Sequence, residues 1–474
     1  MTRDRAWKGF RIAISAAAIT GALAGARILR AQTAPAAWKI HQRSFTLAAN
    51  QTAEEWLENV IPAEVLKDHG SFAEKALLMR GTDVVDSADF QSDPAYPNSG
   101  SWSFTSVMDR AFRLSGASPA AVEGNIQKWG KNLDPDISPL TEVWKAAGKD
   151  LPVPKIPLRL LAVVNRIDLA TMNGCGPGRI GKAEVRFVYA GIPPPSSDPF
   201  FTGIVEFILP CMSKADFHTM GQEWISLASE PSATYLRRLE CILDRRTAQA
   251  ASVRVRVNGE APGGPWYLGQ FAVSAQGLVR QQPDRQANYV LNDCVDRDPC
   301  FNHFVRSHAK NIRNSNYSFT GQSFATNFGM LYHTPPSVLT LANVIGNPVK
   351  TDGIRFSLSI NSCTGCHGWE TVRSGSDSAT PFDHVKYRVQ CRRSLLSNFL
   401  TGTETGNPGI GLWTVGQPPV LSECSPPKAS ARNYNDLLRR HLYLYILNSL
   451  SPNDSDRVWI NALKRSELTA GEEH

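Results

Sequence analysis

Three consecutive β-type runs constrain the fold of this chain more than any other feature. They are LRLLAVVNRIDLA (158–170), KAEVRFVYAG (182–191) and FTGIVEFILP (201–210). In the second run every second residue from Ala183 to Tyr189 is apolar or aromatic, which is the period of a strand with one buried face. We therefore expect three neighbouring strands in an antiparallel arrangement.

Helix-type segments follow these runs. DFHTMGQEWISLAS (216–229) and SATYLRRLECILDRRT (232–247) show apolar residues at a spacing of about 3.6, and WYLGQFAVSAQGLVRQQPD (266–284) has the pattern of a hairpin. Strands followed by helices predict an α+β fold, in which helices cover one side of an antiparallel sheet.

The sequence divides into four regions. We expect a signal peptide over 1–34, a helical and loop-rich N-terminal region over 38–150, an α+β sheet domain over 151–300 and a mainly helical region over 301–474. Helix signals include the acidic start of TAEEWLENVIPAEVLKDHG (52–70) and the apolar segment NYNDLLRRHLYLYILNSLS (433–451).

The N-terminal leader predicts export. Arg3, Arg5, Lys8 and Arg11 precede the apolar stretch 12–26, which is shorter than the roughly 20 residues of a membrane-spanning helix. Residues 1–34 also contribute +5 to the formal charge of +7, so the remaining chain is nearly neutral and shows no sign of nucleic-acid binding. We expect a periplasmic or secreted protein, attached to a membrane only if the leader is not cleaved.

An exported chain with nine cysteines should contain disulfides. Cys175 and Cys211 lie at the ends of adjacent predicted strands, so we expect them to pair. Further predicted bridges close a small loop and an irregular one: Cys294–Cys300 and Cys391–Cys424. Cys241, within a helical segment, is expected to be a buried free thiol.

The segment FSLSINSCTGCHGWETV (356–372) contains Cys363, Cys366 and His367 in the order C-x-x-C-H. Two thiols at this spacing add to the two vinyl groups of a haem, and the adjacent histidine ligates its iron. In an exported chain the motif therefore predicts one covalent c-type haem, used in electron transfer or in redox or gas sensing, with a periplasmic redox partner.

The distal ligand is less constrained. No methionine follows Met330, so the axial methionine of many c-type cytochromes has no downstream candidate here. His384, in TPFDHVKYR, is the first candidate for the distal metal ligand. His441 is the second, although on an apolar helix face a histidine packed in the core is the more frequent outcome.

Two haem-free interpretations of the motif stay open. In the first, Cys363 and Cys366 form a disulfide in a haem-free binding or surface protein, because exported thiols oxidise readily. Alternatively, Cys363, Cys366, His384 and Cys391 have ligand types that suit a structural zinc ion.

The predicted strands also carry charged residues. Alternation places Arg166 with Asp168 on one face, and likewise Glu184 with Arg186, while Glu206 shares a face with its isoleucine neighbours. Cross-strand ion pairs are the simpler interpretation, and a hydrolase that uses Glu206 and Glu184 is the alternative. No other motif of known enzyme chemistry is present, so the sequence does not decide whether the protein is an enzyme.

Two resemblances accompany these motifs. Around Cys363, Cys366, His367 and the helix at 435–450 the chain resembles small class I c-type cytochromes. The blocks LLAVVNRIDLA, GKAEVRFVYAG, FTGIVEFILP, FSLSINSCTGCHGWETV, FDHV and LSNFLTG resemble those of an uncharacterised family of large exported bacterial proteins with one C-x-x-C-H motif. The second resemblance, over about residues 100–445, implies that the sheet and the motif belong to one unit, and it implies no activity.

Overall fold

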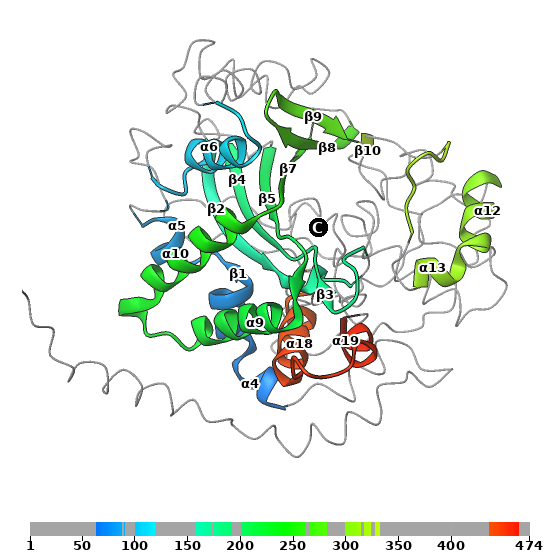
Figure 1. Ribbon diagram of the computed structural model, residues 1–474. Helices are drawn as coiled ribbons and strands as arrows, with labels where there is room; N and C mark the ends of the chain where they lie inside the picture. Colours follow the sequence, from blue (N-terminus) through cyan, green and yellow to red (C-terminus); the bar gives the residue numbers. More distant parts are fainter. Residues whose placement is uncertain are drawn as a thin grey trace, which may run out of the picture. The chain divides into compact units, whose positions relative to one another are not determined.

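The computed structural model describes a little under half of the 474 residues. The described residues are 63–87, 90, 100–118, 158–172, 174–191, 201–260, 265–281, 299–313, 317–323, 328–331, 400 and 436–463. They form an antiparallel sheet with helices, which confirms the α+β class (Figure 1).

The main sheet has eight strands. They are β1 (Leu78–Met79), β2 (Leu158–Arg166), β4 (Glu184–Gly191), β5 (Phe201–Ile208), β7 (Ser252–Glu260), β8 (Pro265–Ser274), β9 (Gly277–Gln281) and β10 (Phe328–Leu331). Their order is β1-β2-β4-β5-β7-β8-β10, and β9 also pairs with β8. Every pairing in this sheet is antiparallel.

The three predicted strands are β2, β4 and β5, which lie side by side (Figure 1). The predicted hairpin is β8–β9, whose turn uses Gly277 at a φ of 129°. Strand β7 occupies one edge of β8, so β9 and β10 must share the other edge. They do so by pairing with opposite ends of β8, Gln270–Ser274 and Pro265–Tyr267 respectively.

The helices of the described residues are α4 (Ala63–Phe72), α5 (Thr82–Val85), α6 (Phe104–Leu114), α9 (Lys214–Ala228), α10 (Ser232–Gln249), α12 (Pro299–Ser307), α13 (Ala309–Arg313), α18 (Asp436–Ser449) and α19 (Asp456–Leu463). Two short turns add to them, the π-helical η2 (Ala73–Leu77) and the 3-10 turn η4 (Ile167–Leu169). A small ribbon pairs β3 (Arg179–Ile180) with β6 (Met212–Ser213). No helix among the described residues is long and apolar enough to cross a membrane.

One face of the sheet is an apolar core covered by α6. The ring of Phe187 on β4 stacks on Trp102 just before α6, with centroids 5.1 Å apart. Next to it Tyr189 donates its hydroxyl hydrogen to the Trp102 carbonyl at 2.9 Å and meets Phe104 edge-on. These residues are all fully buried, so the alternation read from the sequence correctly identified the core face of β4.

Helix α10 buries one side and exposes the other. Its buried side includes Leu239, Ile242 and Leu243, at the spacing that places residues on one helical face. Cys241 falls on the opposite side and has an exposed free thiol, so the prediction that it is buried is wrong. The helical period, rather than the apolar character of cysteine, decides its exposure.

The C-terminal helix α18 confirms the helix expected near residues 433–451. It packs against α4 and η2, which belong to the predicted N-terminal region, and against α9 and η4 of the predicted sheet domain. Strand β1, also from the N-terminal region, pairs with β2. Segments from three predicted regions therefore share one packed unit.

Candidate functional site: a buried ion-pair network

The face of the sheet opposite α6 carries the charged residues. Arg166 on β2 lies directly opposite Glu184 on β4, and Arg186 lies opposite Glu206 on β5. Arg254, on β7, lies opposite Glu206 on its other side. The strand register therefore brings together the charged residues that alternation had placed on one face.

Each carboxylate in this cluster is shared between arginines. Arg186 approaches Glu184 Oε2 to 2.7 Å and Glu206 Oε1 to 3.0 Å. Arg254 pairs with Glu184 Oε1 at 2.9 Å and with Glu206 Oε2 at 2.5 Å. Arg256 adds a third cation beside Glu206, at 3.3 Å. We call these five residues the ion-pair network.

The network is buried, and its charges compensate one another. The side chain of Glu206 is 0% exposed and that of Glu184 only 2%. Burial by itself would raise the pKa of Glu206, but the charges of Arg186, Arg254 and Arg256 and a hydrogen bond from Arg254 lower it to about 2. Glu206 is therefore ionised at every pH at which the protein would function.

This geometry does not favour the hydrolase interpretation. A glycosidase-type mechanism needs one carboxyl group with a raised pKa to donate a proton. Here the pKa of Glu206 is lowered, and one arginine, Arg254, holds both carboxylates. The arrangement instead matches the simpler prediction of cross-strand ion pairs.

A second charged pair lies at the end of β2. Arg166 donates to Asp168 from Nε and Nη2, at 3.1 and 3.0 Å, and both side chains are buried. Their neighbour Asn165 fixes the turn by accepting from the Ile167 amide at 3.0 Å and donating to the Ala76 carbonyl at 3.1 Å. The run NRID thus joins β2 to η4 and to η2 through buried polar contacts.

Arg254 and Arg256 were not among the predicted site residues, because strand β7 was not predicted from the sequence. The signal was present in SVRVRVNGE, where Val253, Val255 and Val257 alternate with the arginines. Two arginines within a short run obscure its apolar face, yet Arg256 is buried and Arg254 nearly so, because Glu206 on the next strand supplies the counter-charge.

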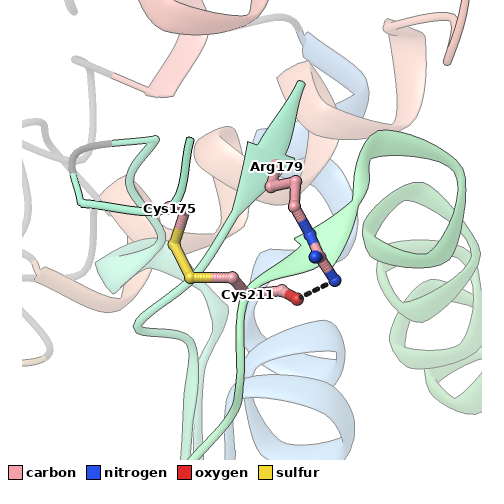
Figure 2. Close-up of a disulfide and its surroundings, with 3 residues drawn as sticks. All are labelled: Cys175, Arg179 and Cys211. Carbon is pink, nitrogen blue, oxygen red and sulfur yellow. Dashed lines mark hydrogen bonds between the residues drawn. A yellow bond between two sulfur atoms is a disulfide. The ribbon is translucent and has the colours of Figure 1, made fainter. Parts of the chain in front are cut away.

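The predicted disulfide between Cys175 and Cys211 is present, with the Cα atoms 5.5 Å apart (Figure 2). Arg179 donates to the Cys211 carbonyl at 2.9 Å and so joins the ribbon β3–β6 to the bridge. Gly181 lies against the sulfurs, because a Cβ there would be 2.5 Å from Cys175 Sγ. Glycine at 181 is therefore required by the bridge itself.

The start of α19 contacts the chain on both sides of this disulfide. Asp456 accepts a hydrogen bond from the Gly178 amide at 3.1 Å and forms an ion pair with Lys214 at 3.0 Å. Lys214 also donates to the Asp454 carbonyl at 2.6 Å. The bridged segment is thus connected to the C-terminal part of the described chain.

The predicted haem and zinc residues lie outside the described residues. They are Cys363, Cys366, His367, His384 and Cys391. The same holds for Cys424, so the bridge Cys391–Cys424 stays a prediction. Cys300, at the start of α12, has an exposed free thiol and so differs from the predicted Cys294–Cys300 bridge. Its predicted partner Cys294 lies outside the described residues.

His441 is packed in the core, as the sequence favoured for that position. Its side chain is 5% exposed, and its ring stacks on Phe72 of α4 with centroids 3.8 Å apart. Its Nδ1 lies 3.3 Å from Nδ1 of His69. Nδ1 of His441 therefore has a hydrogen-bond partner within the protein, namely His69.

Comparisons with protein-family models, with curated proteins and with solved structures each found no match. Function must therefore be inferred from this chain's own residues.

Proposed function

We propose that this protein is exported and carries one covalently attached c-type haem, used in electron transfer or in redox or gas sensing. The observation that carries the proposal is the motif Cys363, Cys366, His367. Its donor set fits the group, because two thiols form the two thioether bonds and one imidazole is a proximal iron ligand. When bound, the haem would supply a one-electron redox centre.

The disulfide Cys175–Cys211 supports export. Structural disulfides persist in oxidising compartments and are rare in the cytosol. The basic and apolar leader over 1–34 has the composition of a signal peptide and points to the periplasm or to secretion. The C-x-x-C-H motif and the disulfide are thus consistent with a single location.

His384 is our candidate for the distal position, since the sequence offers no methionine after Met330. Two histidine ligands would keep the reduction potential low, because methionine ligation raises it. A protein of that kind would need a periplasmic redox partner of low potential.

The test is a pyridine haemochrome spectrum together with intact mass, on protein exported from a host that attaches haem. A c-type α-band and a mass gain of one haem are expected, and both should disappear in Cys363→Ala with Cys366→Ala. Cys241→Ser removes an exposed free thiol on α10 and should keep both signals. A colourless wild-type protein with the mass of a disulfide-only chain would overturn the proposal.

A further inference from the structure

A histidine pair joins two helices that are far apart in the sequence. His69 near the end of α4 and His441 in the first half of α18 are 372 residues apart, and their Nδ1 atoms are 3.3 Å apart. The ring planes differ by 21° and the ring centroids are 5.5 Å apart. The distance between the two Nδ1 atoms is shorter than the distance between the ring centroids by nearly two ring radii. Each Nδ1 therefore lies on the edge of its ring that faces the other histidine.

When both rings are neutral, this contact requires a different tautomer of each ring. One imidazole must carry its hydrogen on Nδ1 and donate it, and the other must carry its hydrogen on Nε2 and accept. A second hydrogen between the two Nδ1 atoms would place two N–H groups head-on and remove the hydrogen bond. The contact is therefore compatible with neutral histidines and not with a doubly protonated pair.

Among the described side chains, none compensates a positive charge on the pair. The pKa of His69 is lowered to about 4 by burial, and that of His441 to about 3 by burial and then by the charge of His69. The charged or titratable side chains on η2, α9, η4 and α18 are Glu74, Lys75, Lys214, Asp216, His218, Glu223, Asp168, Asp436, Arg439, Arg440, Tyr443 and Tyr445, and those of Glu64, Lys67 and Asp68 on α4 lie outside the described side chains. None of the described residues on these four elements contributes to either shift.

The two halves of α18 are held differently. The first half contains His441 and, within the helix, the ion pair between Asp436 and Arg440. The second half packs closely against α9, because a Cβ added at Gly221 would lie only 2.9 Å from Leu447. In addition, Gln222 of α9 forms a hydrogen bond with Asn448 of α18. Loss of the histidine contact would act on the first half of α18, where Leu437, Leu438 and Leu442 are also buried, and would leave the contacts of the second half with α9 in place.

We propose that the His69–His441 pair is an acid-sensitive latch, which holds the first half of α18 against α4 and releases it when protons enter the pair. Neutral imidazoles keep the two helices joined through the Nδ1 hydrogen bond and the stack on Phe72. Protonation of both rings replaces that bond with two like charges in a part-buried contact, which favours separation of the helices. This latch does not depend on a bound haem.

Hydrogen–deuterium exchange at peptide resolution tests the latch between pH 7 and pH 4, with protection factors corrected for the intrinsic rate at each pH. In the full-length wild-type protein, protection of peptides covering 436–443 should fall more than tenfold as the pH drops below 6. Protection of α10 should change much less. Equal loss in both helices, or no loss in α18, would overturn the proposal.

Variants separate the latch from general acid sensitivity. In His69→Gln with His441→Gln, two amides replace the titrating pair, so α18 should keep its protection down to pH 4. The single variant His69→Gln, which retains His441 on Phe72, should shift the loss to lower pH if the double variant does not fold. His303→Gln changes an exposed histidine on α12 and should behave like wild type. Unchanged pH dependence in the His69 variants would contradict the proposal.

Discussion

Glu206 on β5 and Arg254 on β7 lie directly opposite each other in the sheet, and the guanidinium meets the carboxylate at 2.5 Å. Glu206 is 0% exposed and lies between three arginines, so its negative charge compensates more than one cation. Such a carboxylate is a structural requirement, because an uncompensated charge in the interior of a protein is costly.

We expect Glu206→Gln to lower the free energy of unfolding by about 3–5 kcal/mol, since it leaves buried arginines without their counter-charge. Urea unfolding monitored by circular dichroism measures the loss. The matched control is Asp109→Asn, which breaks an exposed pair with Arg113 within α6 and should cost far less. Equal losses in the two variants would mean that burial does not make the network important.

The stability of the protein should fall with acid in two distinct ranges. Folding lowers the pKa of His69 to about 4 and that of His441 to about 3, so their contribution is complete above about pH 6.5. It is lost below that, at up to about 1.4 kcal/mol per pH unit for each histidine. The lowered pKa of Glu206 acts only below about pH 4.5, where its contribution declines until the pH passes about 2.

Urea midpoints measured from pH 8 to pH 2 should resolve the two ranges. Wild type should lose stability from about pH 6.5 downward, and His69→Gln with His441→Gln should stay level to about pH 4.5. If both proteins lose stability in parallel from pH 6.5, the buried histidines are not the source of the acid sensitivity.

The contact between Gly181 and the disulfide predicts a coupled effect. Gly181→Ala places a Cβ 2.5 Å from Cys175 Sγ, so it should destabilise the oxidised protein markedly. The same substitution should cost less when Cys175 and Cys211 are both alanine, a change that by itself removes about 2–5 kcal/mol. A double-mutant cycle measures the coupling.

Gly70→Ala serves as the control for that cycle, because nothing lies within 4 Å of a Cβ there and the residue is within α4. It should be stabilising by about 0.5–1 kcal/mol, in both the oxidised and the cysteine-free proteins. Additive costs for Gly181→Ala in the two backgrounds would show that the sulfur contact does not matter.

For the haem-loaded protein, we expect His384→Ala to change the ferric spectrum from low spin to high spin, because it removes the proposed distal ligand. Covalent attachment should persist, since the thioether bonds involve Cys363 and Cys366. His303→Ala removes an exposed histidine from α12 and should leave the spectrum as in wild type. An unchanged spectrum in His384→Ala would assign the distal position to another group.

Features that depend on local patterns could be predicted from the sequence. Alternation in EVRFVYAG placed Phe187 and Tyr189 on the core face of β4, and the 3.6 period identified α9, α10 and α18. The bridge Cys175–Cys211 also followed, because the ends of adjacent antiparallel strands lie close together. The C-x-x-C-H motif belongs to the same class, since its chemistry depends on five consecutive residues.

Which polar groups meet depends on long-range packing. The strand register places β7 beside Glu206, and this explains why Arg254 and Arg256 lie in the interior of the sheet's charged face. His69 and His441 have no relationship in the sequence, and their contact exists because α4 and α18 pack together. Local patterns specify which side of an element is buried, whereas its partners depend on long-range packing, which one residue's neighbours along the chain do not encode.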